Sequence, residues 1–397
     1  MIKPEIIEYW NGNPSDGIIV DWEKVRKNYK KISPRKYWHI VDYPFENYAY
    51  NIAVSERTGY KTTQILLIGL IVYAMYGVQT EYFRETEEFI IPKALDTLFN
   101  PIIENHYIEK IFGDQWNAIQ YRAGFFKLIH RDSDTGKADR ISSDYFMHTI
   151  ANDQVDTYKS SYSTIRSDLI FFDEFVGTKS RAGQYRYFRQ NLVTVLRMRQ
   201  HGVIFMMANN LNFNNDFYAD FKIRRRILTL DAAGDQAEID VDGTLFYFRI
   251  LPPNLTEAKQ LFNRKYFGYA GSSASSITGG KWEINDYPHI RSEWTDAEPL
   301  SRNFYISHLG DLLRLTLCAP DGIGLIVLVT PATRIYDDSR IFTCGEIRDQ
   351  RYIFKCGSER SGYGILWKLY QRNRWYYARN EDGELVQAFL MAAASIR

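Results

Sequence analysis

A stretch in the first quarter of the chain places an apolar strand pattern, a polar segment and an apolar helix pattern in direct succession. Tyr50 to Val54 predicts a strand, and Thr62 to Tyr76 predicts a helix that Gly77 can end. The most apolar run, Ile65 to Met75, is shorter than the roughly 20 residues of a membrane span, so it predicts a buried helix. A second strand pattern over Gln79–Arg84 completes a strand–helix–strand unit, which is typical of a parallel sheet.

The same alternation recurs further along the chain. Strand patterns at Asp168–Phe172 and Val203–Met207 flank a helix pattern over Tyr185–Gln200, and Trp116–Arg140 has the pattern of an inserted hairpin. Residues Gly271 to Gly280 have the composition of a linker. We therefore expect four parts: an arm (1–44), an α/β domain (45–265), a linker (266–300) and a strand-rich domain that ends in a helix (301–397).

Composition limits the classes of protein to consider. The 397 residues are 45% hydrophobic and 15% aromatic, which argues against disorder. The net charge is +1, so an argument for a polyanionic partner must rest on local charge. The N-terminus has no secretory apolar core, and we expect a cytoplasmic location. Three cysteines in the last quarter predict reduced structural thiols and no zinc site.

A polar segment follows the first strand pattern and opens the first helix pattern. Its residues are Ser55, Glu56, Arg57, Thr58, Gly59, Tyr60, Lys61 and Thr62. A P-loop needs this placement, because N–H groups at a helix start bind phosphates. We expect Lys61 to reach the phosphates of ATP and the Thr62 hydroxyl to ligate Mg²⁺. The standard pattern has glycines where Ser55 and Tyr60 stand, so a polar strand–helix turn is the alternative.

Two adjacent carboxylates, Asp173 and Glu174, end the apolar run Leu169–Phe172. This is the Walker B arrangement, in which a buried strand presents an aspartate that holds the Mg²⁺ water shell. Glu174 is then placed to activate the attacking water. A solvated strand end is the alternative for this run alone, but its order and spacing after Lys61 favour nucleotide hydrolysis.

A third strand pattern, Val203–Met207, leads to Asn209. We expect Asn209 to donate to the γ-phosphate or to orient the water, and a turn-forming asparagine pair is the alternative. Open parallel sheets bind ligands at the carboxyl ends of their strands. The ends of the three strand patterns are therefore expected to converge on one site.

A basic segment lies between Gly177 and Leu230, where ten Lys or Arg residues stand against two acids, with aromatic residues interleaved. This excess predicts phosphate contacts with a polyanion, and the alternatives are a solvated face or a subunit interface. We assign the DNA contacts to Lys179, Arg181, Arg186, Arg189, Lys222, Arg224, Arg225 and Arg226.

On these residues the chain resembles the DNA-packaging ATPases, or encapsidation proteins, of small podophages with protein-primed genomes. The resemblance rests on Asn51–Val54 leading into Arg57 and Lys61-Thr62, on Ile170–Phe175, on Val195–Arg199 and on Asn209. It implies an α/β P-loop ATPase domain of the ASCE, terminase type. It also implies that Arg57 acts within the loop and that Arg197 is an arginine finger directed toward a neighbouring subunit.

The resemblance further implies a motor that uses ATP and Mg²⁺ to drive double-stranded DNA into a preformed viral procapsid. Such a motor is a homo-oligomeric ring, a pentamer, docked on the viral portal in the cytoplasm of the infected host cell, with no membrane involved. The C-terminal domain is implied to be a degenerate, vestigial RNase H-like α+β domain. Asp321 falls in the turn of its first hairpin and not on the strand, which predicts a domain that grips DNA or portal without nuclease activity.

Two other functions fit parts of this pattern. A P-loop kinase with a small-molecule substrate would use the same loop, but the basic segment and the second domain argue against it. A non-enzymatic viral structural or DNA-binding protein with a decayed P-loop would explain Ser55 and Tyr60. DNA stimulation of ATPase activity separates a motor from a kinase, and measurable ATP turnover excludes the decayed protein.

Overall fold

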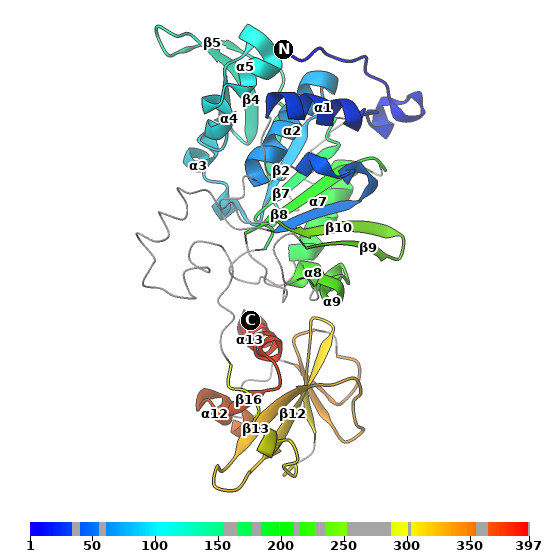
Figure 1. Ribbon diagram of the computed structural model, residues 1–397, viewed down its shortest axis with the longest axis vertical. Helices are drawn as coiled ribbons and strands as arrows, with labels where there is room; N and C mark the ends of the chain where they lie inside the picture. The colour runs from blue at the N-terminus through cyan, green and yellow to red at the C-terminus, as the bar shows by residue number, and fades with distance from the viewer. Residues whose placement is uncertain are drawn as a thin grey trace. The chain divides into compact units, whose positions relative to one another are not determined.

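The computed structural model describes residues 1–33, 40–54, 61–154, 166–176, 184–197, 199–209, 215–227, 230, 235–251, 287–300, 303–345, 347–354 and 364–395 (Figure 1). Their contacts divide them into two units. The first unit contains the described residues of 1–177, 184–211 and 225–281, and the second contains those of 212–224 and 282–397. No helix in this described part has both the length and the apolar composition of a membrane span.

The first unit is built on a mixed, largely parallel sheet. Its described strands run in the order β3–β4–β6–β2–β7–β8–β1–β10–β9, with β5 paired to β4. The strands from β6 to β10 in this order are parallel, and the outer ones are antiparallel. They are β1 (Tyr50–Val54), β2 (Thr80–Arg84), β3 (Ala118–Arg122), β4 (Phe125–Arg131), β5 (Ala138–Ile141), β6 (Met147–Ala151), β7 (Leu169–Asp173), β8 (Val203–Ala208), β9 (Gln236–Val241) and β10 (Thr244–Ile250).

Helices pack on both faces of this sheet, because successive side chains of a strand point to opposite faces. Tyr82 and Phe171 belong to the same core cluster as the apolar residues of helix α2. Their neighbours Phe83 and Phe172 contact Phe188 of α7, at ring-centroid distances of 5.5 and 5.0 Å. Strands β2 and β7 are therefore covered on both faces, as the continuous apolar runs predict.

The helices in the described part of the chain are short apart from α1, α2, α7 and α13. They are α1 (Trp22–Ile32), α2 (Lys61–Tyr76), α3 (Pro92–Asp96), α4 (Asn100–Glu104), α5 (Tyr107–Phe112), α7 (Gln184–Leu196), α8 (Asp216–Asp220), α9 (Arg224–Ile227), α12 (Gly364–Gln371) and α13 (Asn380–Ser395).

The central helix α2 is apolar on all sides and nearly all its residues are buried, as expected for a helix enclosed by other elements. Gly69 lets α2 approach β2 closely, because a Cβ atom there would lie 2.8 Å from Thr80 Oγ1. Gly77 has φ +69° and its N–H donates to the Tyr73 carbonyl. The prediction that Gly77 ends this helix is therefore confirmed.

The N-terminal residues are fastened to the first unit. The Ile2 N–H donates to the Ile111 carbonyl, and the Ile18 N–H donates to Asp168 Oδ2 at 3.1 Å. Helix α1, beside α2 in Figure 1, begins after Asp21, whose carboxylate accepts from the Lys24 N–H at 3.0 Å. Its buried residues Val25, Tyr29 and Ile32 join the core cluster that contains α2. Its charged residues therefore lie on the opposite side.

The second unit contains a smaller mixed sheet with the order β15–β14–β11–β12–β13–β16. Strands β11, β12 and β13 form an antiparallel meander, whereas β14 and then β15 run parallel to β11, and β16 runs parallel to β13. Trp367 of α12 and Phe389 of α13 pack with Trp375 in its core. The strands are β11 (Phe304–His308), β12 (Asp311–Cys318), β13 (Ile326–Pro331), β14 (Arg340–Thr343), β15 (Tyr352–Phe354) and β16 (Trp375–Tyr377).

Candidate functional site

Three strands that the sequence predicts to end in polar residues finish at the same edge of the first sheet. β1 ends at Val54, β7 at Asp173 and β8 at Ala208. Their ends are aligned, because Asp173 pairs with Met207 and Val54 pairs with Ala208. β8 lies between β1 and β7, so the residue that follows β8 can reach the ends of both neighbours. This edge is where an open parallel sheet binds its ligands.

Asp173 is the buried centre of the site. The Thr62 hydroxyl lies 3.3 Å from each of its carboxylate oxygens and donates from the first turn of α2. The Tyr82 hydroxyl donates to Oδ2 at 3.0 Å, and Arg84 Nη1 lies 3.4 Å from the same oxygen. The carboxylate is therefore held between the start of α2 and the end of β2.

Glu174 follows β7 in the left-handed region, with φ 54°. This conformation costs a residue with a Cβ atom about 1–2 kcal/mol, and such costs concentrate at functional sites. Arg84 Nη2 donates to its Oε2 at 2.7 Å, and Asn209 Nδ2 donates to its Oε1 at 2.8 Å. The side chain is 48% exposed, so the carboxylate is held in place but keeps access to water.

Lys61 and Asn209 connect the helix start to Glu174. Lys61 is buried at the first position of α2, and its Nζ donates to Asn209 Oδ1 at 2.9 Å. The amide of Asn209 donates in turn to Glu174, so hydrogen bonds and ion pairs link six side chains in series; the two end members, Lys61 and Thr62, are sequence neighbours, and the backbone between them completes a ring. Its members in order are Lys61, Asn209, Glu174, Arg84, Asp173 and Thr62.

Burial controls the charges in this ring. It raises the pKa of Asp173, and the Arg84 guanidinium opposes this rise while the neighbouring Glu174 adds to it. Burial also lowers the pKa of Arg84, but Tyr82, Asp173 and Glu174 together raise it, so the guanidinium stays charged. The pKa of Tyr82 lies well above its usual value through burial and the nearby Asp173, which keeps its hydroxyl a donor. A further cation beside Asp173 would favour its ionised form.

The residues at this edge fit a magnesium nucleotide. Mg²⁺ prefers oxygen ligands, which Thr62 and Asp173 supply from two different elements. Lys61 has a buried ammonium group, the charge that a phosphate ligand requires, and Glu174 has a carboxylate accessible to water. The described residues contain no cluster of three or more His, Cys, Asp or Glu arranged for a metal ion. Mg²⁺ in phosphate-binding sites takes only one or two protein ligands, so the fit does not need such a cluster.

Sequence reasoning gave no role to Tyr82 and Arg84. The sequence predicts the strand Gln79–Arg84, but it assigns no site residue to the carboxyl end of that strand. The signal was present, because β2 runs parallel to β7 and therefore ends at the same edge. Residues at alternate positions, such as 82 and 84, share one face of a strand.

The remaining predicted nucleotide-site residues are those of the loop 55–60 and Arg197. Ser55, Glu56, Arg57, Thr58, Gly59 and Tyr60 lie outside the described residues, so the conformation of the loop stays a prediction. Arg197 is exposed, one residue beyond α7, and its N–H donates to the Val193 carbonyl at 3.1 Å. It has φ 45°, the left-handed conformation that commonly ends a helix.

The predicted DNA-contact residues are distributed over several elements. Arg186 and Arg189 are exposed on α7, and Arg189 lies over the Tyr185 ring at 5.6 Å. Lys222 and Arg226 are also exposed. Lys179, Arg181 and the side chain of Arg225 lie outside the described residues.

Two arginines of the basic segment have structural partners. Arg224 is buried and forms an ion pair with Asp311 within the second unit. Arg199 is also buried, and its Nε donates to Asp168 Oδ1 at 2.6 Å. Part of the local charge excess therefore serves to hold the fold, an explanation that the sequence alone does not separate from phosphate binding.

Comparison with known proteins identifies the fold. The chain is similar to the Phi-28 gp11 DNA packaging motor, with 13% identity and a TM-score of 0.56 over 91% of this chain and 99% of that one. It is similar to a chain of the bacteriophage Phi-29 viral genome packaging motor assembly, with 13% identity and a TM-score of 0.56 over 87% and 96%. Neither a protein-family model nor a curated protein matches the sequence. The chain thus shares the mixed α/β fold of phage DNA-packaging motor proteins.

Proposed function

We propose that this protein is an ATP-hydrolysing motor that moves double-stranded DNA into a viral procapsid. The observation that carries the proposal is the ring of contacts in which the start of α2 and the ends of β7 and β8 bring together a lysine, a hydroxyl, two carboxylates and an asparagine. Phosphoryl transfer from ATP uses this set of groups. The shared fold supports the choice of a packaging motor over a small-molecule kinase.

Each residue has a defined role in this proposal. Lys61 and the residues 55–60 bind the phosphates, and Arg57 adds charge within that loop. Thr62 and Asp173 hold Mg²⁺, which neutralises charge on the phosphates. Glu174 accepts the proton of the attacking water, and its access to solvent supports that role.

Asn209 couples phosphate binding to the base. Its Oδ1 accepts from Lys61 and its Nδ2 donates to Glu174. A lysine that turns toward an anion gives up the asparagine oxygen, so the amide is then free to reorient toward water or phosphate. The position of Glu174 is therefore sensitive to whether Lys61 binds phosphate.

The assembly follows from the resemblance and the shared fold. We assign a homo-oligomeric ring of five subunits that docks on the viral portal, with Arg197 reaching the nucleotide of a neighbour. The strand order of the ATPase unit, with β8 between β1 and β7, supports the ASCE-type assignment. The order β13–β12–β11–β14–β15, with β14 and β15 parallel to β11, supports a vestigial RNase H-like second unit.

ATP turnover with and without duplex DNA tests the proposal. Wild-type protein should hydrolyse ATP faster when DNA is present. Glu174→Gln should bind ATP but lose at least roughly 100-fold in turnover, because it removes the base and keeps the shape. Lys61→Ala should weaken ATP binding itself. The control is Glu104→Gln, an exposed residue of α4.

Three results would contradict this function. Wild-type-like turnover in Glu174→Gln removes the Walker B assignment. Turnover that ignores DNA but depends on a small acceptor favours the kinase. An absence of ATP binding in the wild type favours a DNA-binding protein with a decayed P-loop.

A further inference from the structure

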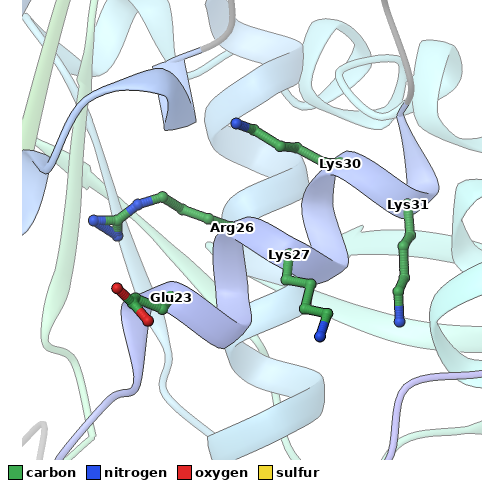
Figure 2. Close-up of a pocket in the computed structure, with 5 residues that line it drawn as sticks. All are labelled: Glu23, Arg26, Lys27, Lys30 and Lys31. Atoms are coloured by element: carbon green, nitrogen blue, oxygen red, sulfur yellow. The ribbon is translucent and has the colours of Figure 1, made fainter.

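Helix α1 lines a groove on the surface of the first unit, far in sequence from every residue of the nucleotide site. The groove is open to solvent, has a volume of about 600 Å³, and is lined by Glu23, Arg26, Lys27, Lys30 and Lys31. Figure 2 shows these side chains projecting from α1, with Lys27 and Lys31 extending from the same side of the helix. Four cations and one carboxylate therefore line this groove.

The cations of the groove fall into two kinds. Arg26 forms an ion pair with Glu46, and Lys30 Nζ lies 3.1 Å from Asp42 Oδ1. These pairs hold Arg26 and Lys30 against acidic residues of the same unit. Lys27 and Lys31 are exposed, and the ammonium group of neither forms an ion pair or a hydrogen bond with any residue in the described part of the chain. Two ammonium groups are thus left available for an external anion.

The spacing of these two lysines matches a repeating anion. They are four residues apart on one helix, which places their Cβ atoms about 5–6 Å from each other. Each long side chain can then reach a different phosphate of one strand. The buried face of α1 is anchored by Val25, Tyr29 and Ile32, so the two lysines project from a fixed support.

Positive charge is concentrated on this helix. From Trp22 to Ile32 it carries Lys24, Arg26, Lys27, Lys30 and Lys31 against one acid, Glu23. The whole chain balances 49 basic against 48 acidic residues, so this is a local excess in a neutral protein. Such an excess on one element is the electrostatic mark of a nucleic-acid contact.

We propose that the α1 groove is a second DNA-binding surface, on which Lys27 and Lys31 contact the phosphate backbone of double-stranded DNA. The choice of DNA rests on the proposed function, whereas the surface itself rests on charge and geometry. Backbone contacts of this kind position a duplex without reading its sequence. They act in addition to the basic segment of residues 179–226.

The salt dependence of DNA binding tests the proposal in the full-length protein. Each phosphate contact contributes about 0.9 to the slope of log affinity against log salt, so Lys27→Ala with Lys31→Ala should reduce the slope by about 1.8. Alanine keeps α1 helical. The matched control is Lys93→Ala with Lys137→Ala, which removes two exposed lysines elsewhere in the first unit whose ammonium groups also lack partners among the described residues.

The outcomes separate this surface from the motor function. The proposal holds if the slope falls in the α1 pair, stays unchanged in the control pair, and ATP turnover without DNA stays at the wild-type rate. It is wrong if the α1 pair keeps the wild-type slope or if both pairs lose equally. A loss seen with duplex RNA but not with duplex DNA also overturns it. If wild-type turnover ignores DNA while the slope still falls, the motor function fails and this surface stands.

Discussion

Tyr82 serves both the core and the site. Its ring packs edge-on against Phe171 at a centroid distance of 5.3 Å, and its hydroxyl donates to Asp173 Oδ2 at 3.0 Å. The hydrogen bond stabilises the ionised carboxylate and so opposes the effect of burial on the pKa of Asp173. In the proposed nucleotide site Tyr82 is a positioning residue, because its hydroxyl contacts Asp173, the proposed Mg²⁺ ligand.

Tyr82→Phe should separate the two contributions. The ring packing is kept, so the free energy of unfolding should fall by only about 0.5–1.5 kcal/mol. The Mg²⁺ concentration that half-saturates ADP binding should rise roughly 10-fold, because groups that orient metal ligands contribute about 10–100-fold in affinity. Fluorescence titration of a labelled ADP against Mg²⁺ measures this shift. An unchanged Mg²⁺ requirement, equal to that of the exposed-residue control Tyr187→Phe, limits Tyr82 to packing.

At this scale, sequence predicts residues that belong to a pattern and misses those that act through contacts. Five predicted site residues lie at or next to the end of a strand or the start of a helix, and the structure brings them together as expected. They are Lys61, Thr62, Asp173, Glu174 and Asn209. Tyr82 and Arg84 lie inside a strand pattern, where an aromatic and a cation are ordinary residues. The parallel pairing of β2 with β7 shows that the carboxyl end of β2, where they lie, is at the same edge of the sheet as Asp173.

At the scale of elements, the segment that follows α7 contains two arginines, Arg197 and Arg199, in different environments. Arg199 donates to Asp168, to the Ser167 carbonyl and to the Val195 carbonyl, at 2.6, 2.9 and 3.0 Å. The side chains of Arg199 and Asp168 are 2% and 6% exposed. Arg197 is exposed after the last helical residue. Arg199 therefore joins the end of α7 to the start of β7, whereas the side chain of Arg197 lies at the surface of the unit.

Substitution by alanine should distinguish these environments. Arg199→Ala should lower the free energy of unfolding by about 3–5 kcal/mol, because it leaves the Asp168 carboxylate buried without its partner. Arg197→Ala should change it by less than about 0.5 kcal/mol, as for most exposed residues. Urea unfolding followed by circular dichroism measures both. Equal small losses in the two variants would mean that the Arg199 pair is not buried in solution.

The elements themselves were largely predictable where one pattern dominates. The strands at 50–54, 79–84 and 203–207 and the helix at 62–76 are confirmed to within one residue. β6 was not predicted, because His148 interrupts its apolar run. In the fold that histidine is buried beside Glu81, with Nδ1 2.9 Å from Oε2. A polar residue whose partner comes from a neighbouring strand cannot be placed by periodicity alone.

The second unit should not cut DNA. Its neighbouring strands β11 and β14 carry no Asp or Glu, and β12 carries only Asp311, whereas a two-metal nuclease needs several converging carboxylates. Asp311 is engaged with Arg224. Supercoiled plasmid incubated with the protein and Mg²⁺ or Mn²⁺ should stay intact on an agarose gel. Cleavage that is lost in Asp311→Asn or Asp321→Asn would instead show a functional nuclease.

At the scale of the whole molecule, the proposed ring places part of each ATP site on a neighbouring subunit. An arginine finger supplied in this way contributes roughly 10³–10⁵ in rate. The structure supplies an exposed Arg197, whose backbone N–H is bonded to the Val193 carbonyl at the end of α7. The alternatives are a DNA contact and a solvated surface residue, and a mixing experiment separates all three.

Arg197→Ala and Glu174→Gln subunits should restore activity when they are mixed. Alanine retains the Cβ atom, so the backbone cost at φ 45° is unchanged and only the guanidinium is lost. Each variant alone should be inactive. In a head-to-tail ring, a Glu174→Gln subunit can supply its arginine to an intact Arg197→Ala pocket, and an equal mixture should recover up to about a quarter of wild-type turnover.

The control is a mixture of Lys61→Ala and Glu174→Gln subunits. It should recover nothing, because each change damages the ATP pocket of its own subunit and no intact pocket remains. If the first mixture stays as inactive as its parents, Arg197 does not act on a neighbour. If Arg197→Ala alone keeps its DNA-independent turnover, the residue is a DNA contact or a surface residue. The salt slope of DNA binding then decides between these two.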